Sequence, residues 1–210
     1  NSMESISGIY DPDLSEHSLG IYTMLLEVRH AMEVGLKHYY IGYFASNIPT
    51  FDYKLRLKSM EFLDPFHQQW RAMDEYKSSN MPCSLLFAAY DKIIQILQEA
   101  GVSCHLMLHP AYRFGLLNKN LSFNSLNLPL FVICYPENTE KYTILISYDI
   151  ENKSYSLQLG RLLSLLNVDS SLLVENPTGP PVCQGLIAIV QEFIQSPDPE
   201  DFIELLCLKS

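Results

Sequence analysis

A chain of 210 residues, 48% of them hydrophobic, can bury one large core or two modest ones, which excludes an intrinsically disordered protein. The formal charge of −10 excludes a general nucleic-acid-coating surface, because phosphate binding depends on many lysine and arginine contacts, so any RNA contact is expected to be local. The longest apolar runs fall short of the roughly 20 residues that span a bilayer, and no secretory signal is visible, so we expect a cytoplasmic protein without a membrane span.

The first predicted elements are a strand, a helix and a second strand. Residues 5–10 alternate in polarity and run into a turn at 11–13, which predicts a strand. The helix that follows has Ser18 as its amino-terminal cap and Gly35 as its left-handed stop. Residues 37–44 form an aromatic-rich second strand, and a crossover of this length makes the two strands parallel. The apolar positions of the helix are Ile21, Met24, Leu25, Val28, Ala31 and Met32.

A basic edge is predicted after the second strand. Residues 51–58 alternate strictly between apolar and charged side chains. In an extended chain Lys54, Arg56 and Lys58 therefore point the same way. This arrangement would place three positive charges on one edge of an otherwise acidic protein.

The chain is predicted to hold two domains, 1–80 and 81–210, joined by a polar linker at 77–80. The second begins with an amphipathic helix at 85–100, which Gly101 closes. It continues as a small α/β layer whose strand order the sequence leaves open. Its predicted strands are 103–108, 130–135, 142–148 and 154–159, and its later predicted helices are 161–166, 184–195 and 199–207.

No metal site is predicted from the cysteines and histidines. The five cysteines form no CxxC pair and lie in or beside apolar stretches, so buried free thiols are expected rather than disulfides or metal ligands. His105 and His109 are four residues apart, but a strand followed by Pro110 would separate their side chains.

The junction between the first strand and its helix is the most favourable place for a binding site. Strand carboxyl ends and helix amino termini present unpaired N–H groups and a positive dipole end, which suit phosphate or carboxylate groups. Gly20, in the first turn, would let a ligand approach the backbone closely. The alternative is that Ser18 only caps a core helix and that Gly20 only avoids a clash.

Several short motifs occur in an order that resembles the arginyl-tRNA–protein transferase family. The motifs are Ile9-Tyr10-Asp11-Pro12-Asp13, Ser18-Leu19-Gly20, Tyr39-Tyr40-Ile41-Gly42-Tyr43, Pro49 and Tyr53-Lys54. The likeness runs from Ser5 to about Trp70 and is closest to the bacterial branch, in which the Phe51-Asp52-Tyr53-Lys54 form occurs. It implies transfer of arginine or a similar residue from charged tRNA to a protein amino terminus, which marks that protein for degradation in an N-degron pathway. It implies no cofactor other than aminoacyl-tRNA as co-substrate.

The same resemblance implies the carboxy-terminal half of a GNAT-like domain. The expected fold class is therefore α/β, a partial GNAT-like mixed sheet with helices followed by a small second α/β unit. The junction at residues 16–21 lacks the glycine spacing of acetyl-CoA enzymes, which disfavours that donor. Eukaryotic members have Cys-Pro-Lys-Met-Arg-Tyr-Lys where this chain has residues 48–54, so two cationic positions and a thiol are lost and Asp52 reverses a charge.

The candidates for contact with substrate and tRNA come from the junction, the aromatic strand and the basic edge. They are Tyr10, Asp11, Asp13, Ser18, Gly20, Tyr39, Tyr40, Tyr43, Lys54, Arg56 and Lys58. The aspartates are either turn formers or groups that recognise an α-amine and assist proton transfer. The tyrosines belong to the core or line a cleft. The cations form a solvated edge or contact the acceptor phosphates of tRNA. No catalytic residue can be assigned from the sequence.

A half domain leaves a strand with an unpaired edge and an uncovered face. We therefore expect either an inactive fragment or a partner chain or second copy that completes the sheet. Charged tRNA and protein amino termini are the partners that the resemblance implies. Two other functions stay open: a non-catalytic GNAT-like protein-interaction domain, and an acyltransferase that uses another donor.

Overall fold

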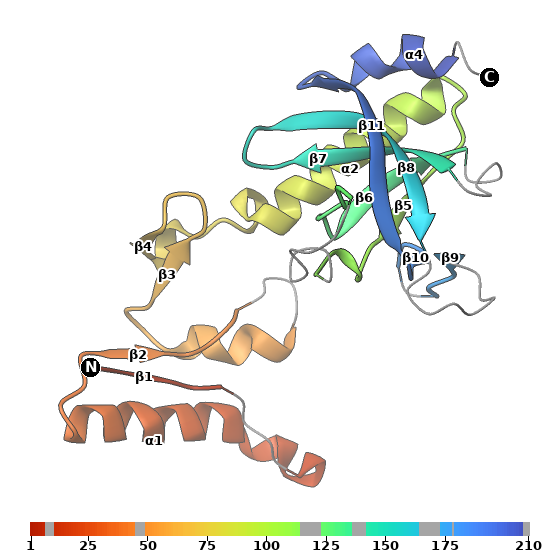
Figure 1. Ribbon diagram of the computed structural model, residues 1–210. Helices are drawn as coiled ribbons and strands as arrows, with labels where there is room; N and C mark the ends of the chain where they lie inside the picture. The colour runs from red at the N-terminus through yellow and green to blue at the C-terminus, as the bar shows by residue number, and fades with distance from the viewer. Residues whose placement is uncertain are drawn as a thin grey trace. The chain divides into compact units, whose positions relative to one another are not determined.

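The chain folds into two units, Asn1–Ser78 and Ser79–Ser210, each with its own strands and helices. The computed structural model describes residues 1–6, 11–44, 49–113, 123–135, 142–163, 173–177 and 179–207 (Figure 1). The α/β class predicted from the sequence is confirmed. None of the helices in the described part of the chain is long and apolar enough to cross a membrane.

The first unit is built on two short parallel strands joined by a helix. β1 (Ser2–Glu4) pairs with β2 (His38–Tyr40), and α1 (Leu19–Glu33) forms the crossover (Figure 1). The pairing is extended by the Ser5 N–H, which donates to the Tyr40 carbonyl at 2.9 Å. The predicted parallel arrangement is confirmed, but the first strand lies earlier than predicted. Most of the predicted segment, residues 7–10, lies outside the described residues.

The two ends of α1 differ in how well the sequence predicted them. Gly35 has φ +74° just beyond the helix, so the predicted left-handed stop is confirmed. The predicted side-chain cap is wrong, because the Ser18 hydroxyl makes no capping hydrogen bond. Ser18 itself is left-handed, with φ 52°, where the chain leaves η1 (Pro12–His17), a 3-10 helix. Its carbonyl accepts from the Ile21 and Tyr22 N–H groups instead.

Only part of the apolar stripe of α1 is covered within the first unit. Met24 and Ala31 are buried, at 2% and 4% exposure. Leu25 and Met32, which the sequence placed on the same stripe, are 52% and 75% exposed. The helix therefore presents a second apolar surface, the outer face of α1, made of Tyr22, Leu25, Leu26 and Met32.

The prediction that residues 51–58 are extended is wrong. Pro49–Arg56 form η2, a 3-10 helix. Such a helix has three residues per turn, whereas side chains in a strand repeat their direction every two residues. Within this helix the side chains of Lys54 and Arg56 point in different directions, and Lys58 lies beyond the helix, so the predicted edge shared by three cations does not form. The physical reason is that alternation over eight residues specifies a strand only when a neighbouring strand offers a ladder.

The first unit closes with a hairpin and a short helical turn. β3 (Glu61–Asp64) and β4 (Gln69–Ala72) are antiparallel, and η3 (Met73–Glu75) follows. The Asp64 carboxylate accepts from the Phe66 and His67 N–H groups at 2.9 and 3.1 Å and pairs with the His67 ring at 2.8 Å. These contacts fix the turn, and the hydrogen bond from the His67 ring is the main reason that the pKa of Asp64 is lowered.

The second unit is a seven-stranded sheet with helices before and after it. The strand order is β11-β8-β7-β6-β5-β10-β9, antiparallel throughout except between β10 and β5. A turn, η4 (Ser78–Asn80), and α2 (Pro82–Glu99) precede the sheet, and η6 (Pro199–Phe202) and α4 (Ile203–Cys207) follow it. The strands are β5 (Cys104–Leu108), β6 (Leu130–Cys134), β7 (Tyr142–Asp149), β8 (Ser154–Leu163), β9 (Leu173–Val174), β10 (Val182–Cys183) and β11 (Leu186–Ser196).

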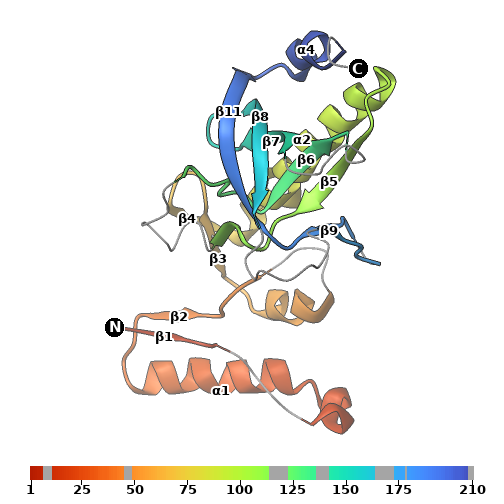
Figure 2. The same cartoon turned by 45° about the vertical axis from the view of Figure 1, so that its right-hand side comes forward.

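The main core of the second unit lies between α2 and the sheet. Figure 2 shows α2 running across one face of the strands. Tyr90 and Ile93 of α2 are fully buried there, with Phe202 and Leu206 from the carboxy-terminal helices. The Tyr90 hydroxyl donates to the Leu130 carbonyl at 2.7 Å, so its polar group is satisfied. Burial of each such side chain contributes about 1.5–3 kcal/mol.

Two of the helices predicted in the second unit are wrong. Residues 184–195 were expected to be helical, yet Leu186–Ser196 form β11, which pairs along β8. Residues 161–163 belong to β8, and the rest of the predicted helix at 161–166 lies outside the described residues. Apolar runs with few polar interruptions suit a buried strand as well as a helix, and the partner strand decided the outcome.

The prediction that all five cysteines are buried holds for only three of them. Cys104, Cys134 and Cys183 are buried, and burial raises the pKa of each of these thiols. Cys83 and Cys207, near helix ends, are exposed. Among the described residues, no group of three or more histidine, cysteine, aspartate or glutamate side chains could hold a metal ion.

A buried histidine joins three segments of the second unit. His109 is fully buried, and its Nδ1 and Nε2 atoms lie 3.2 and 3.1 Å from the carbonyl oxygens of Leu128 and Gly185. Burial lowers the pKa of His109 below 6.5, and the two carbonyls offset part of that effect. The unfolded chain therefore takes up a proton at a higher pH than the folded chain does.

The free energy of unfolding of the second unit should consequently fall as the pH decreases through about 6.5. We expect urea denaturation followed by circular dichroism to show this loss between about pH 7.5 and about pH 5.5. His109→Gln should flatten the dependence over this window. The matched control is His105→Gln, an exposed histidine of β5, which should keep the wild-type slope. A slope that His105→Gln removes, or that His109→Gln leaves intact, contradicts the assignment.

Candidate functional site

The carboxyl end of β2 is held by a lysine from η2. The Lys54 ammonium donates to the Ile41 carbonyl at 2.8 Å and to the Tyr43 carbonyl at 2.7 Å. Gly42 lies between these residues with φ +74°, and this backbone lets both carbonyls face one ammonium group. A Cβ atom at Gly42 would also lie 2.9 Å from the Ser5 carbonyl oxygen. We call this arrangement the lysine clamp.

Burial makes Lys54 unsuited to the phosphate contact that the basic edge implied. The residue is only 9% exposed, its ammonium lies 5.3 Å from the Phe51 ring centroid, and burial lowers its pKa. Arg56 and Lys58 are exposed, so the two neighbouring cations remain accessible to an external anion. The predicted row of three equivalent charges is therefore replaced by one structural lysine and two surface cations.

The first turn of α1 is covered by a tyrosine from η2. A Cβ atom at Gly20 would lie 3.0 Å from Cε2 of Tyr53, which is tighter than an ordinary contact. Gly20 therefore admits the Tyr53 ring, and the structure bears out the alternative in which this glycine avoids a clash. The Tyr53 ring is therefore a close neighbour of the backbone at Gly20.

A partly buried hydrogen bond joins α1 to β2. The Tyr39 hydroxyl donates to Oε2 of Glu27 at 2.6 Å. Burial is the main cause of a raised pKa at Tyr39, and the Glu27 carboxylate adds to it, so this phenol keeps its proton. Tyr39 thus connects the crossover helix to the strand that the lysine clamp holds.

The remaining predicted site residues that the structure describes lie on the surface of the first unit. Asp11 and Asp13 are exposed at the start of η1, where an Asp11 carboxylate oxygen accepts from the Asp13 N–H at 3.0 Å, as expected of a turn former. Tyr40 packs its ring 5.5 Å from that of Trp70. Tyr43 is 89% exposed. Ser18 is exposed as well, and Tyr10 lies outside the described residues.

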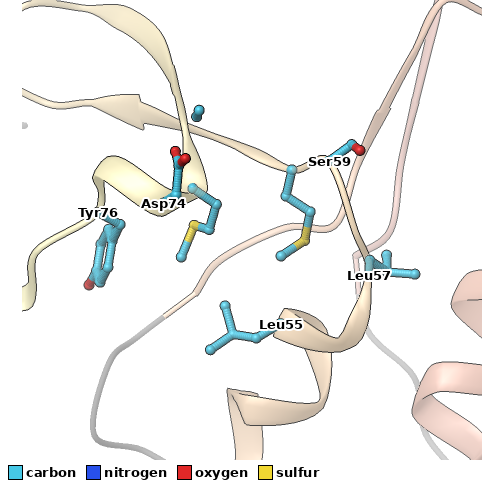
Figure 3. Close-up of a pocket in the computed structure, with 8 residues that line it drawn as sticks. Leu55, Leu57, Ser59, Asp74 and Tyr76 are labelled. Atoms are coloured by element: carbon cyan, nitrogen blue, oxygen red, sulfur yellow. The ribbon is translucent and has the colours of Figure 1, made fainter.

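A pocket that the sequence did not reveal lies beside the end of η2. It has a volume of about 560 Å³ and is lined by Leu55, Leu57, Met60 and Met73, with Asp74 among its polar groups (Figure 3). Its walls come from η2, the following connection, β4 and η3. Sequence reasoning missed it because the 3-10 helix that brings its walls together was predicted as a strand.

Residues 1–64 match the family model described as Arginine-tRNA-protein transferase, C terminus. Curated relatives include the aspartate/glutamate leucyltransferase of Hyphomonas neptunium, which is 37% identical over 73 residues, or 35% of this chain and 28% of the relative. The enzyme of the same name from Leptospira interrogans is 29% identical over 79 residues, or 37% of this chain and 31% of the relative. The enzyme of the same name from Rhizobium leguminosarum is 33% identical over 82 residues, or 39% of this chain and 30% of the relative.

The similarity confirms a likeness to aminoacyl-tRNA–protein transferases, while these relatives are leucyltransferases by name and not arginyltransferases. The chain spans less than a third of the length of each of these relatives. No solved structure matches the chain. The matched residues include β1, α1, β2 and the lysine clamp.

Lys54→Met should destabilise the first unit by about 1–3 kcal/mol, because two carbonyls lose their charged donor. Trp70, the only tryptophan of the chain, lies in β4, so its fluorescence during urea denaturation reports on the first unit alone. The exposed Lys58→Met is the matched control and should change the free energy of unfolding by less than about 0.5 kcal/mol. Equal effects of the two substitutions would show that the clamp adds nothing to the free energy of unfolding.

Proposed function

We propose that residues 1–78 form the carboxy-terminal part of a GNAT-like aminoacyl-tRNA–protein transferase domain. The match of residues 1–64 to the family model carries this proposal. The parallel strand, helix, strand arrangement supports it, because that order fits the latter half of a GNAT-like fold. Residues 79–210 form a second domain whose role the proposal leaves open. We place the protein in the cytoplasm, where charged tRNA is present.

The amino acid that we propose for transfer is leucine, and the acceptor is a protein with an amino-terminal aspartate or glutamate. This choice rests on the names of the relatives, which are aspartate/glutamate leucyltransferases. Arginine, named in the description of the family model, is the alternative donor residue. Either product carries a new amino-terminal residue of the kind that an N-degron pathway reads.

The proposed reaction is attack of an α-amine on the ester that links the amino acid to tRNA. The amine must be unprotonated; its nitrogen forms the new C–N bond, the ester C–O bond breaks, and the terminal ribose oxygen leaves with the proton. Asp11 and Asp13 are exposed carboxylates close to the amino terminus of α1, where they can attract the incoming amino group. Tyr40, the last residue of β2, and Tyr43, whose carbonyl takes part in the clamp, are further contact candidates.

Arg56 and Lys58 are the proposed contacts to the tRNA phosphates. Both are exposed, and they lie two and four residues after Lys54, the residue that clamps β2. The net charge of −10 limits the number of phosphates that the chain can neutralise, so the salt dependence of binding should be shallow. Lys54 positions this segment and does not itself touch the nucleic acid.

The outer face of α1 is the proposed contact with the rest of a transferase domain. Four large apolar side chains there are between 46% and 75% exposed, which is typical of a surface that another chain covers. The matched relatives are more than three times as long as the segment they share with this chain. On the strength of these exposed apolar side chains, we propose that a partner chain or a second copy packs against α1 and completes the two-stranded sheet.

The transfer reaction can be tested with protein expressed from its complete reading frame. Labelled leucine on tRNA should be transferred to a peptide that begins with aspartate and not to one that begins with glycine. Labelled arginine on tRNA is the comparison donor. Absence of transfer from every charged tRNA would contradict the proposed function and favour a non-catalytic interaction domain.

A chimera isolates the contribution of the matched segment. The 73-residue segment of the Hyphomonas neptunium enzyme is replaced by its counterpart from this chain, and leucine transfer should be retained. Adding Arg56→Gln and Lys58→Gln should raise KM for tRNA and reduce the salt slope by about two. Lys37→Gln, which removes an exposed lysine elsewhere in the segment, should leave both values unchanged.

The proposed association through the outer face of α1 can be tested by sedimentation velocity. Leu25→Asp should release the partner or second copy, because a buried carboxylate without a counter-charge opposes association. Trp70 fluorescence should show little change in the free energy of unfolding, since Leu25 is 52% exposed within its own unit. Val190→Asp replaces a 53% exposed apolar side chain of the second unit and is the control. A wild-type chain that sediments as a monomer contradicts this part of the proposal.

A further inference from the structure

The pocket beside η2 combines an apolar interior with a polar rim. Leu55 is 42% exposed and points into the cavity, while the oxygens of Ser59 and Asp74 lie on the opposite rim (Figure 3). Its volume of about 560 Å³ is within the range of about 300–1,000 Å³ that is usual for small-molecule sites. The lining methionines, Met60 and Met73, are flexible and polarizable, so they can adapt to an inserted aliphatic group.

One carboxylate of the pocket has no counter-charge among the described residues. Arg71, the nearest arginine in the sequence, lies 3.2 Å from Asp64 and 3.7 Å from Glu75. Asp74, next to Glu75, is exposed and takes part in neither pair. A cationic group bound at the rim would therefore find a carboxylate that is already placed and not neutralised within this unit.

The wall that carries Asp74 is held by aromatic packing. Tyr76 contacts Phe44 and Phe62 edge-to-face, with ring centroids 5.6 and 5.4 Å apart. Phe62 belongs to β3, so the pocket wall is tied to the hairpin. This packing holds the chain two residues after Asp74, while the methionine side chains of the lining stay adaptable.

We propose that this pocket binds the aminoacyl group of charged tRNA when its side chain is aliphatic, with the side chain among Leu55, Met60 and Met73 and the α-ammonium at Asp74. The inference rests on the proposed function and deepens it. A leucyl group fits both parts of the pocket, because its side chain is apolar like the interior and its α-ammonium is opposite in charge to Asp74. An arginyl group would bring its guanidinium against the apolar interior, at a desolvation cost.

The position of the pocket agrees with the proposed tRNA contact. Leu55 and Leu57 line the cavity, and Arg56 and Lys58 alternate with them along the same short segment. The acceptor end of tRNA carries its amino acid on the terminal ribose, next to the last phosphates. One segment can therefore contact the phosphates with its cations and the aminoacyl group with its leucines.

The inference can be tested with L-leucinamide, which has the side chain and α-ammonium of the leucyl ester but no tRNA. Methionines labelled in the methyl group give seven probes in the full chain. Leucinamide should shift the Met60 and Met73 resonances with a Kd near the millimolar range, and leave Met24 and Met107, which are buried elsewhere, unchanged. Argininamide and N-acetyl-leucinamide should shift them more weakly.

Two variants separate the parts of the pocket. Asp74→Asn should weaken leucinamide binding about threefold to fivefold, as expected for an exposed ion pair, without affecting N-acetyl-leucinamide. Asp52→Asn, which neutralises an exposed carboxylate of η2 outside the pocket, is the matched control. Ala72→Phe should fill the cavity and abolish the shifts, while the Met24 and Met107 resonances report that both units remain folded.

Failure of the inference and failure of the proposed function have different signatures. Leucine transfer by the complete protein without any leucinamide shift at Met60 and Met73 overturns the pocket assignment and leaves the transferase intact. Equal shifts with leucinamide and argininamide overturn the proposed selectivity. Leucinamide binding that Asp74→Asn weakens supports the pocket, whether or not the transfer assay succeeds.

Discussion

The lysine clamp is the contact on which the first unit depends. The Lys54 ammonium brings together two carbonyls on either side of Gly42, and this fixes where the chain turns after β2. A charge-assisted hydrogen bond of this kind contributes about 1.5–3 kcal/mol, more than a neutral one. Because Lys54 lies in η2, the same contact places that 3-10 helix against the sheet.

Placement of η2 then determines the surroundings of α1 and of the pocket. Tyr53, one residue before the clamp, lies over Gly20 in the first turn of α1. Leu55, one residue after it, faces the cavity that Asp74 borders. Three consecutive side chains thus serve the helix, the strand and the pocket. Their different directions follow from three residues per turn, which an extended chain would not provide.

In the proposed transferase, this geometry gives different residues of the first unit different roles. The clamp is structural, Arg56 and Lys58 face outward, and the pocket has the chemical character of an aliphatic amino acid with a free α-ammonium. The exposed apolar face of α1 offers a surface for the rest of a transferase domain. The second unit has its own core around Tyr90.

The sequence by itself determined the order of the motifs, the parallel strand, helix, strand of the first unit, the stop at Gly35 and the strands β5, β6 and β7. These features are local: they follow from residue periodicity and from glycine backbone preferences. Only the tertiary structure decided that Lys54 is buried, that Tyr53 covers Gly20 and that Leu186–Ser196 form a strand. Such outcomes depend on which distant carbonyl, ring or strand is available, and an alternating or apolar run carries no information about that partner.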